Sequence, residues 1–350
     1  MGEGLSRPYH VRNPEVSVLM SCYNGSRWLH EAIVSVLAQT FENFEFVLVD
    51  DGSTDETWNI IQSYCARDER IVAISKKNTG LPDSLNVGIA HAKGAWIARL
   101  DADDLCEPTR LEEQVNFVRN HPEVVLLGTG FVEIDEQGRF IKKHLYPSGH
   151  RKLVWHLEHL RRFFPHSSAF YRVDVVRQVG GYNSRIRRNV HLPAHAEDWR
   201  LWLELALRGK IACLPKPYVR IRKHPNQVSL DNNGRRQLWD ATAATVCHFL
   251  RKAGCEDPSV SASADEYIAF LNWVENRMEE SGVFARRKAW VDARVAFFAN
   301  QNNLIGAFRC GARLMQSGHA IALVWEKFFG SALPERLAQD WMKRSCATTP

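Results

Sequence analysis

The sequence predicts an α/β fold, with a mostly parallel sheet flanked by helices, followed by an α-helical C-terminal extension. The chain of 350 residues is long enough for two ordinary domains. Between Val16 and Arg222, short β-rich runs alternate with helical stretches, which is typical of βαβ units. After about Gln227, β-rich runs become rare, and Ala, Arg, Glu, Leu and Trp recur at helical spacing.

These patterns divide the chain into three predicted parts. They are an N-terminal extension over residues 1–15, an α/β domain over residues 16–230 and a helical C-terminal extension over residues 235–350. Asp231–Gly234 is the predicted hinge before the extension. Helical spacing in the extension is clearest in two groups, Tyr267, Leu271, Val274 and Met278, and Trp290, Ala293, Val295 and Phe297.

Apolar runs and helical spacing predict the elements of the α/β domain in order. The first four strands are expected over Val16–Cys22, Phe44–Val49, Ile71–Ile74 and Ala95–Leu100. Helices are expected over residues 28–37, Glu56–Ala66, Asp83–Ala92 and Arg110–Asn120. A further strand is expected over Val124–Leu127, and a hairpin over Phe131–Ile134 and Arg139–Leu145.

The charge of the chain is mild overall but unevenly placed. The formal net charge is +5, yet residues 139–188 hold twelve Lys and Arg against two acids, Glu158 and Asp174. Such a stretch favours phosphates, anionic lipid head groups or nucleic acid as partners. A solvated basic surface without a partner explains it equally well.

Cysteine usage and hydropathy predict a cytoplasmic protein. The eight cysteines form no Cys-x-x-Cys pair, which argues against a zinc site and favours reduced thiols. The first ten residues lack the apolar core of a secretory signal. No apolar run approaches the ~20 residues that a membrane span requires.

The most informative segment is Trp96–Asp104, an apolar run that ends in three carboxylates. Ligands of open α/β sheets bind at the carboxyl ends of the strands. Asp101 and Asp103 are two residues apart, so a bend in the chain would aim both at one point. Two hard oxygen donors at one point suit Mg²⁺ or Mn²⁺, which also bind substrate phosphates. The alternative is an acidic turn that caps the helix near Pro108, and Asp104 is expected to form the turn into that helix.

Polar residues also follow the first three predicted strands. The first strand ends in Ser21–Gly25, where Asn and Gly permit a tight turn. The second ends in Asp50 and Asp51, adjacent carboxylates that repel each other unless a cation or a hydrogen-bond donor satisfies them. A ring N–H like that of uracil, a loop N–H or a basic side chain would serve. The third strand leads into Lys76–Gly80.

Two segments further along the chain carry candidate catalytic groups. Glu197 and Asp198 enter a predicted helix, where the helix dipole favours acids whatever their function. The functional alternative is a carboxylate base that takes a proton from a hydroxyl group. His224 stands just before the predicted hinge, and taken alone such a histidine is more often structural.

The motifs in this order resemble those of the family 2 glycosyltransferases. The segments that carry the resemblance are Val16–Gly25, Val47–Asp55, Ser84–Gly94, Leu100–Asp104, Glu197–Asp198 and His224 with Asn226–Ser229. The match covers residues 16 to about 230, and residues 235–350 match nothing in that family. Each motif alone has low specificity, but the set in this order is specific.

The resemblance implies a GT-A fold, a nucleotide-diphosphate sugar as donor and an inverting transfer. It assigns the nucleotide to Ser21, Tyr23, Asn24, Asp50, Asp51, Asn78 and Asp101. Asp51, with Asp50 as the alternative, would accept the ring N–H of the base. The metal, Mg²⁺ or Mn²⁺, falls to Asp103, Asp101 and His224, with Asp103 nearest the ion. Asp198 corresponds to the catalytic base and Glu197 to its companion, while His166–Ser168 lies in a segment that contacts acceptor or donor in this family.

The expected function is therefore transfer of a sugar to an acceptor hydroxyl in surface glycan, lipopolysaccharide or exopolysaccharide synthesis. We expect UDP as the nucleotide, with dTDP and GDP as alternatives. The acceptor would be a glycan or a lipid-linked glycan, with peripheral contact at the inner face of the membrane. A non-catalytic sugar-nucleotide-binding scaffold is the first alternative, although it would have no need of Asp198. A nucleic-acid-binding protein ranks last, because the chain carries no recognised reader motif.

Overall fold

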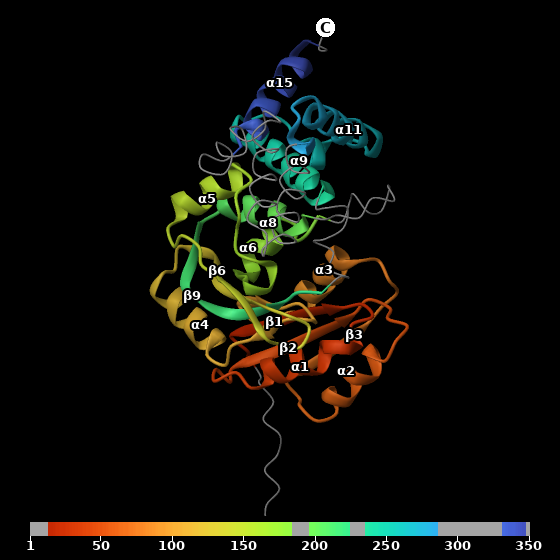
Figure 1. The fold of residues 1–350 in the computed structure, drawn as a ribbon, viewed down its shortest axis with the longest axis vertical. Helices are drawn as coiled ribbons and strands as arrows, with labels where there is room; N and C mark the ends of the chain where they lie inside the picture. The colour runs from red at the N-terminus through yellow and green to blue at the C-terminus, as the bar shows by residue number, and fades with distance from the viewer. Residues whose placement is uncertain (1–12, 184–195, 225–234, 286–330, 348–350) are drawn as a thin grey trace, which may run out of the picture. The chain divides into compact units, whose positions relative to one another are not determined.

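The structure, a computed structural model, describes residues 13–183, 196–224, 235–285 and 331–347 (Figure 1). The chain forms two compact units. The first comprises residues 1–154, 163–185 and 204–224, and the second comprises residues 155–162, 186–203 and 225–350. The predicted hinge, the segment Asn226–Ser229 and the helical pattern around Trp290 all lie outside the described residues, as does most of the predicted N-terminal extension.

The described strands of the first unit form one sheet. Their order is β3-β2-β1-β4-β8-β6-β9-β5, with β7 beside β6. The strands are β1 (Val16–Cys22), β2 (Phe44–Asp50), β3 (Ile71–Ser75), β4 (Trp96–Arg99), β5 (Leu105–Cys106), β6 (Val124–Ile134), β7 (Phe140–His144), β8 (Phe170–Arg172) and β9 (Lys210–Arg222). The predicted α/β fold is thus confirmed, and the first four strands lie where they were expected.

Four helices of the first unit lie where the sequence predicts them, namely α1 (Ser26–Leu37), α2 (Thr57–Cys65), α3 (Leu81–His91) and α4 (Arg110–Asn120). The structure adds α6 (Val173–Gln178) and a short 3-10 helix, η1 (His166–Ser168), which were not predicted. Two more helices are divided between the units, namely α5 (His150–Glu158) and α8 (Glu197–Ala206).

The order of the strands creates a switch point between β1 and β4. Strands β1 to β4 pair in parallel, and the chain moves from β1 to β2 to β3 through α1 and α2. It then passes back across β1 to reach β4 through α3. Because such crossovers are right-handed, α3 covers the face opposite α1 and α2, as Figure 1 shows. Ligands of doubly wound sheets bind where the strand order reverses in this way.

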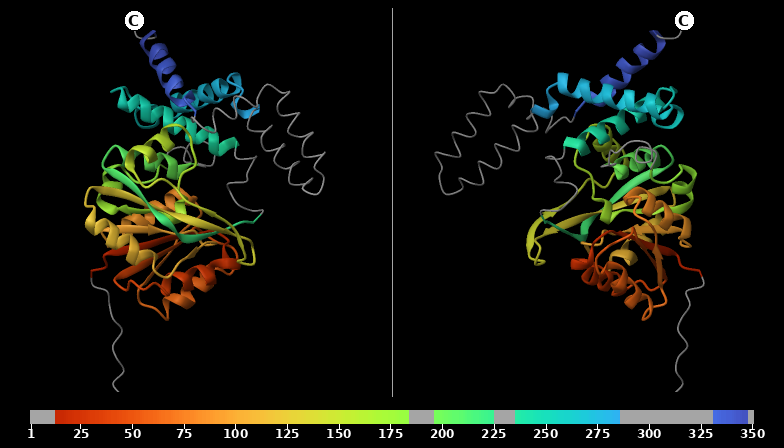
Figure 2. Two further views of the ribbon diagram at one scale, coloured as in Figure 1. Left: turned by 60° about the vertical axis from the view of Figure 1, so that its left-hand side comes forward. Right: turned by 90° about the vertical axis from the view of Figure 1, so that its right-hand side faces the viewer.

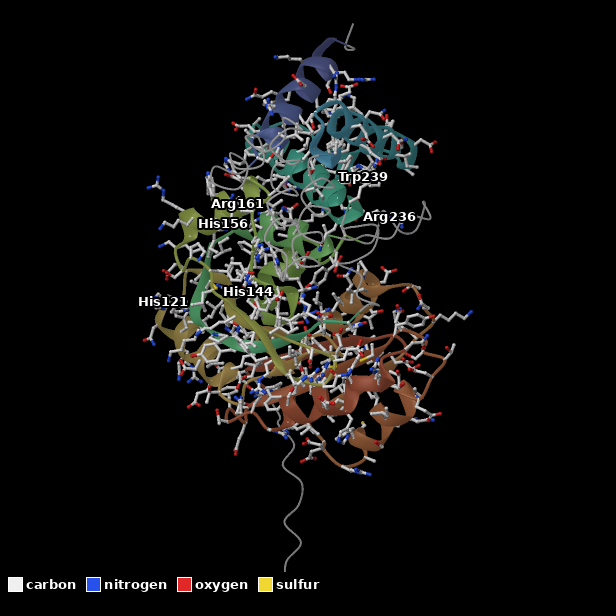
Figure 3. All side chains as sticks on the ribbon, in the orientation of Figure 1. His121, His144, His156, Arg161, Arg236 and Trp239 are labelled. Carbon is white, nitrogen blue, oxygen red and sulfur yellow. The ribbon has the colours of Figure 1, made fainter. Side chains whose placement is uncertain are left out.

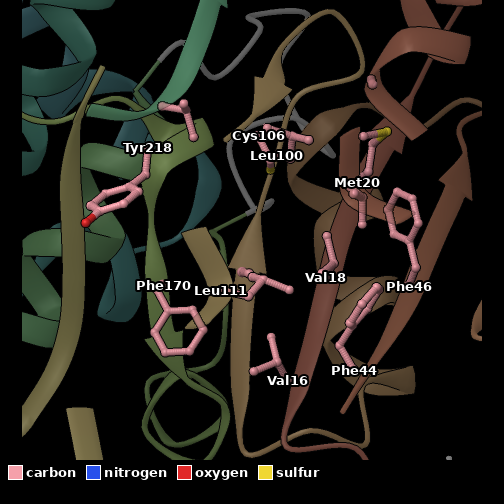
Figure 4. Close-up of a cluster of buried hydrophobic side chains, with 14 of the residues drawn as sticks. Val16, Val18, Met20, Phe44, Phe46, Leu100, Cys106, Leu111, Phe170 and Tyr218 are labelled. Atoms are coloured by element: carbon pink, nitrogen blue, oxygen red, sulfur yellow. The ribbon is translucent and has the colours of Figure 1, made fainter. Parts of the chain in front are cut away.

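The alternating side chains of β1 and β2 build the core beneath this point. Val16, Val18 and Met20 of β1 lie beside Phe44 and Phe46 of β2 in one buried cluster (Figure 4). Buried residues of α1 and α4 complete the cluster, which are Leu29, Ala32, Ile33, Val36, Leu111, Val115 and Val118. On the other face, Leu19 packs so closely against Gly88 of α3 that any β-carbon there would lie 2.1 Å from the leucine side chain.

The second half of the sheet is mixed, and three of its strands, β5, β8 and β9, were not predicted from the sequence. β8 pairs antiparallel with both β4 and β6, whereas β9 runs parallel to β6. The predicted strand 124–127 and the first arm of the predicted hairpin are a single strand, β6, whose pairing with β7 is visible in Figure 2. Within β6, position 128 requires glycine, because a β-carbon there would lie 2.2 Å from the ring of Phe164.

The described part of the second unit is helical, as predicted for the C-terminal extension. Its helices are α9 (Arg235–Lys252), α10 (Pro258–Ser261), α11 (Ala264–Glu280) and α15 (Leu333–Ala347). Trp239 of α9, labelled in Figure 3, donates its indole N–H to the carbonyl of Leu271 in α11 over 3.1 Å. Ser263 and Glu266 cap α11 through reciprocal hydrogen bonds. Within the described ranges, no helix has the length and hydropathy to cross a bilayer.

Candidate active site

The loops that follow β1, β2 and β4 gather the predicted site residues of the first unit at one edge of the sheet. Parallel strands end at the same edge, so these loops are neighbours although they are far apart in sequence. Asn24 ties the first two loops together. Its side-chain oxygen accepts the N–H of Thr54 over 2.8 Å, and its own N–H donates to Ser53 Oγ over 2.9 Å. The φ of Asn24 is +50°, a conformation that asparagine tolerates better than most residues.

The other nucleotide candidates of these loops differ in exposure. Ser21 is half-buried near the end of β1, and Tyr23, just after the strand, is 54% exposed. Asn78 is exposed in the loop after β3. Tyr23 and Asn78 therefore present side chains that a ligand can reach, whereas the amide oxygen of Asn24 is already used within the protein.

Asp50 and Asp51 are both buried, and the protein itself supplies the donors that adjacent carboxylates require. Asp50 accepts the N–H of Ser53 over 3.2 Å and the hydroxyl of Ser75 over 3.3 Å. Asp51 accepts the backbone N–H groups of Thr79 and Gly80 over 2.9 and 2.8 Å.

Lys76 completes this arrangement as the cation that faces Asp51. Its ammonium group forms an ion pair with the Asp51 carboxylate and also donates to Thr79 Oγ1 over 2.6 Å. Of the three kinds of partner expected for the acidic pair, a loop N–H and a basic side chain are both present. Asp51 thus fixes the loop Lys76–Gly80, which carries Asn78.

Asp101, Asp103 and Asp104 form a cluster after β4 in which one oxygen of each lies within 4.8 Å of the others. Asp101 and Asp103 are partly exposed, while Asp104 is buried. The turn expected at Asp104 is present, since its N–H donates to the carbonyl of Asp101 over 3.2 Å. The structure adds that the Asp104 carboxylate faces inward and belongs to the cluster.

Each carboxylate of this acidic cluster has a partner from another part of the chain. Asp101 pairs with the fully buried Arg99, whose nitrogen lies 2.5 Å from the carboxylate oxygen. Ser167 donates its hydroxyl toward Asp101 and Asp104, at 2.7 and 2.5 Å. Arg222 donates its backbone N–H to Asp104 over 2.9 Å.

His224 lies beside Asp103, with its Nε2 2.8 Å from the Asp103 carboxylate. The imidazole is held against the ring of Trp28, with 4.5 Å between the ring centroids. The structure therefore brings together all three residues predicted for the metal, with His224 in contact with Asp103.

The cluster retains more negative charge than its partners balance. Burial, followed by the charge of Asp101, raises the pKa of Asp103 against the hydrogen bond from His224. Burial and the charges of Asp103 and Asp101 raise the pKa of Asp104 well above its usual range. A divalent cation would relieve this repulsion, and carboxylate oxygens are the ligands that Mg²⁺ and Mn²⁺ prefer. These residues fit such an ion.

Glu197 and Asp198 occupy the first turn of α8, as the sequence predicts. They belong to the second compact unit, whereas the acidic cluster belongs to the first. Asp198 accepts the N–H of Trp199 over 2.7 Å through its own carboxylate.

Sequence reasoning missed the residues that support the acidic cluster. Arg99, Ser167 and Arg222 are separated from each other by tens of residues, and only tertiary structure joins them. A signal was present for Arg99, because an arginine at the end of an otherwise apolar strand needs an anion. Ser167 lies in the segment predicted to contact substrate, but its hydroxyl is engaged by Asp101 and Asp104.

The family model and the relatives that match this chain are both glycosyltransferases. The model of the family described as glycosyl transferase family 2 matches residues 17–180. The amylovoran biosynthesis glycosyltransferase AmsE of Erwinia amylovora is 31% identical over 234 residues, which cover 66% of this chain and 82% of that protein.

Two solved structures share the fold at low sequence identity. The S. aureus TarS 1–349 structure in complex with UDP-GlcNAc aligns with a TM-score of 0.54 at 19% identity, covering 75% of this chain and 72% of that one. The mannosyltransferase PcManGT of Pyrobaculum calidifontis, in complex with GDP-Man and Mn²⁺, aligns with a TM-score of 0.50 at 17% identity. It covers 93% of this chain and 91% of that one.

Replacing Asp51 with asparagine tests whether this carboxylate holds the Lys76–Gly80 loop. The substitution removes the ion pair with Lys76 and turns an amide N–H₂ toward backbone donors. We therefore expect the free energy of unfolding to fall by about 1–3 kcal/mol. Hydrogen–deuterium exchange at Thr79 and Gly80 should accelerate. The exposed Glu42→Gln serves as the control. Unchanged exchange with lost nucleotide binding would instead indicate that Asp51 acts on the ligand alone.

Proposed function

Because the chain belongs to glycosyl transferase family 2, we propose that this enzyme moves a sugar from a nucleotide-diphosphate donor to an acceptor hydroxyl with inversion. The observation that carries the proposal is the convergence of Asp101, Asp103 and Asp104 at the switch point of the sheet. A diphosphate leaving group requires positive charge at such a point, and three carboxylates are suited to recruit it through a metal ion.

The metal would be held by Asp103 and Asp101, with His224 beside it. When bound, Mg²⁺ or Mn²⁺ would neutralise the charge that develops on the diphosphate as the glycosidic bond breaks. Arg99 keeps Asp101 oriented, and the contact with His224 keeps Asp103 oriented. Because both supporting side chains are largely buried, the two ligands would be preorganised.

Asp198 is proposed as the base that removes the proton from the acceptor hydroxyl, with Glu197 as its companion. Inversion needs the acceptor to attack the sugar from the side opposite the leaving group, so base and metal serve opposite ends of one displacement. A position in the first turn of a helix favours the ionised carboxylate, which is the form that accepts a proton. A scaffold that only binds nucleotide sugars would not need this group.

A UDP-sugar is the donor we propose first, with Tyr23 and Asn78 as nucleotide contacts that a ligand can reach. The TarS structure that shares this fold contains UDP-GlcNAc, while PcManGT contains GDP-Man, so GDP is the alternative. The name of the relative AmsE connects that protein with amylovoran biosynthesis. We extend this to a proposed role in surface polysaccharide assembly.

Peripheral contact with an anionic membrane is proposed for the edge strand β7. Phe140, Ile141 and Leu145 are 68%, 48% and 53% exposed there. Lys142 and Lys143 are exposed between them. Apolar side chains interleaved with lysines fit an anionic lipid surface, where a lipid-linked acceptor would be found.

A thermal-shift titration with nucleotide sugars and Mn²⁺ tests the metal assignment. We expect UDP-sugars to raise the melting temperature in the presence of Mn²⁺, because ligands that bind only the folded state stabilise it. Asp103→Asn should remove the Mn²⁺-dependent part of the shift. Asp174→Asn, which removes an exposed carboxylate paired with Arg172, should leave it intact. An undiminished Mn²⁺ effect in Asp103→Asn would overturn the assignment.

Turnover of Asp198→Asn tests the proposed base. General-base catalysis typically contributes ~10²–10⁴ in rate, so release of UDP should fall by that factor while nucleotide binding persists. Asp265→Asn removes a carboxylate from the first turn of α11 and controls for the effect on helix stability. If Asp198→Asn turns over as fast as the unaltered enzyme, another group takes the proton.

Co-sedimentation with vesicles tests the contact of β7 with lipid. Each basic residue near an anionic surface contributes about 1 kcal/mol, so Lys142→Glu with Lys143→Glu should lower binding to phosphatidylglycerol vesicles at least about tenfold. Phosphatidylcholine vesicles and the exposed pair Lys93→Glu with Arg208→Glu are the controls. Equal binding to phosphatidylglycerol and phosphatidylcholine vesicles would exclude an electrostatic contact of β7 with the membrane.

A further inference from the structure

In the first turn of α8, Glu197 and Asp198 are followed at once by residues bound to the C-terminal helices. We infer that α9 and α10 position the Asp198 carboxylate, with Trp199 and Arg200 as the positioning residues. This inference rests on the proposed role of Asp198 as the base. It assigns a part in the reaction to the helices of residues 235–261, which lie outside the matched family region.

Trp199 forms the first connection. Its indole N–H donates to Thr245 Oγ1 in α9 over 3.1 Å. Thr245 is fully buried, and its hydroxyl donates in turn to the carbonyl of Ala241 over 2.7 Å. The threonine rotamer is thereby fixed, so the indole of Trp199 meets an acceptor that does not move.

Arg200 forms the second connection, to a buried ionic network. Its guanidinium lies 3.4 Å from the carboxylate of Asp257, the residue that caps α10, and donates to Ser259 Oγ. Arg251, in the last turn of α9, pairs with the same carboxylate. Arg200 is 8% exposed and Asp257 is 7% exposed, so the network is shielded from solvent.

The charge state of this network favours a fixed geometry. Burial opposes ionisation of Asp257, but the charges of Arg200 and Arg251 outweigh it and lower the pKa of Asp257. Asp257 is therefore ionised at neutral pH and attracts both arginines. Breaking a buried pair of this kind leaves an unbalanced charge, which makes alternative orientations of α8 costly.

The helical repeat explains why these two connections control Asp198. Successive residues of an α-helix are rotated by about 100°, so Trp199 and Arg200 leave the helix about 100° and 200° away from Asp198. Trp199 and Arg200 attach the helix to its neighbours on two sides, and Asp198 points in a third direction. These two attachments fix the rotation of the first turn about the helix axis. The direction of the Asp198 side chain is fixed with it.

A double-mutant cycle in the full-length protein tests the inference. The readout is steady-state UDP release from the UDP-sugar that gives the largest rise in melting temperature in the thermal-shift titration. Trp199→Phe keeps the aromatic packing and removes only the N–H donor, whereas Arg200→Met keeps the length and removes the charge. We expect each to lower kcat roughly 10- to 100-fold with KM for the donor unchanged, within the range that a displacement of about 1 Å can cause.

Combination with Asp198→Asn separates positioning from general stability. If Trp199 and Arg200 act through Asp198, their substitution should cause no further loss of kcat in the Asp198→Asn background. Glu158→Gln is the matched control. It breaks an ion pair with His248 and Lys252 in the same unit, while the Trp199–Thr245 hydrogen bond and the Arg200–Asp257 ion pair keep both partners, so kcat should be unchanged.

The outcomes distinguish this inference from the proposed function. Full turnover of Asp198→Asn would overturn the proposed base itself. A slow Asp198→Asn beside a normal kcat in folded Arg200→Met and Trp199→Phe would overturn the positioning role alone, as would equal losses in both backgrounds. If Arg200→Met does not fold, Trp199→Phe still decides, because it removes a single hydrogen bond.

Discussion

The proximity of three carboxylates, whose oxygens lie within 4.8 Å of one another, is the constraint on which the candidate site depends. Like charges this close repel each other strongly when they are shielded from water. The fold answers with Arg99 for Asp101, with Ser167 and a backbone N–H for Asp104, and with His224 for Asp103. The compensation is incomplete, since burial and mutual repulsion still raise the pKa of Asp103 and Asp104. The repulsion that remains among these carboxylates is the basis on which we propose a divalent cation here.

The topology of the sheet brings the acidic cluster and its partners together. The strand order reverses between β1 and β4, which is where ligands of doubly wound sheets bind, and the acidic cluster follows β4 at this point. Strand β9 runs parallel to β6 and ends at Arg222, which places the backbone N–H of Arg222 against Asp104 and His224 against Asp103. The second half of the sheet thus brings together, across more than a hundred residues of sequence, the partners that the acidic cluster needs.

Local patterns in the sequence were sufficient for the parallel half of the sheet and for the positions of the acids. Apolar runs and helical spacing predict β1 to β4 and their helices, because each is set by neighbours in sequence. The partners of the acids could not be predicted, since the contact of Ser167 with Asp104 spans 63 residues and that of Arg222 with Asp104 spans 118. The continuous strand β6 was divided in the prediction into residues 124–127 and 131–134, and Gly128, in the gap between these two ranges, makes room for the ring of Phe164.

We propose that the acidic cluster binds a divalent cation together with a nucleotide diphosphate. Anomalous diffraction from crystals grown with Mn²⁺ and UDP tests this claim most directly, because the signal locates the ion without assuming its ligands. We expect a manganese peak in contact with the Asp103 carboxylate, with the diphosphate as a further ligand. A nucleotide bound at the switch point with no manganese beside Asp101, Asp103 or Asp104 would contradict it.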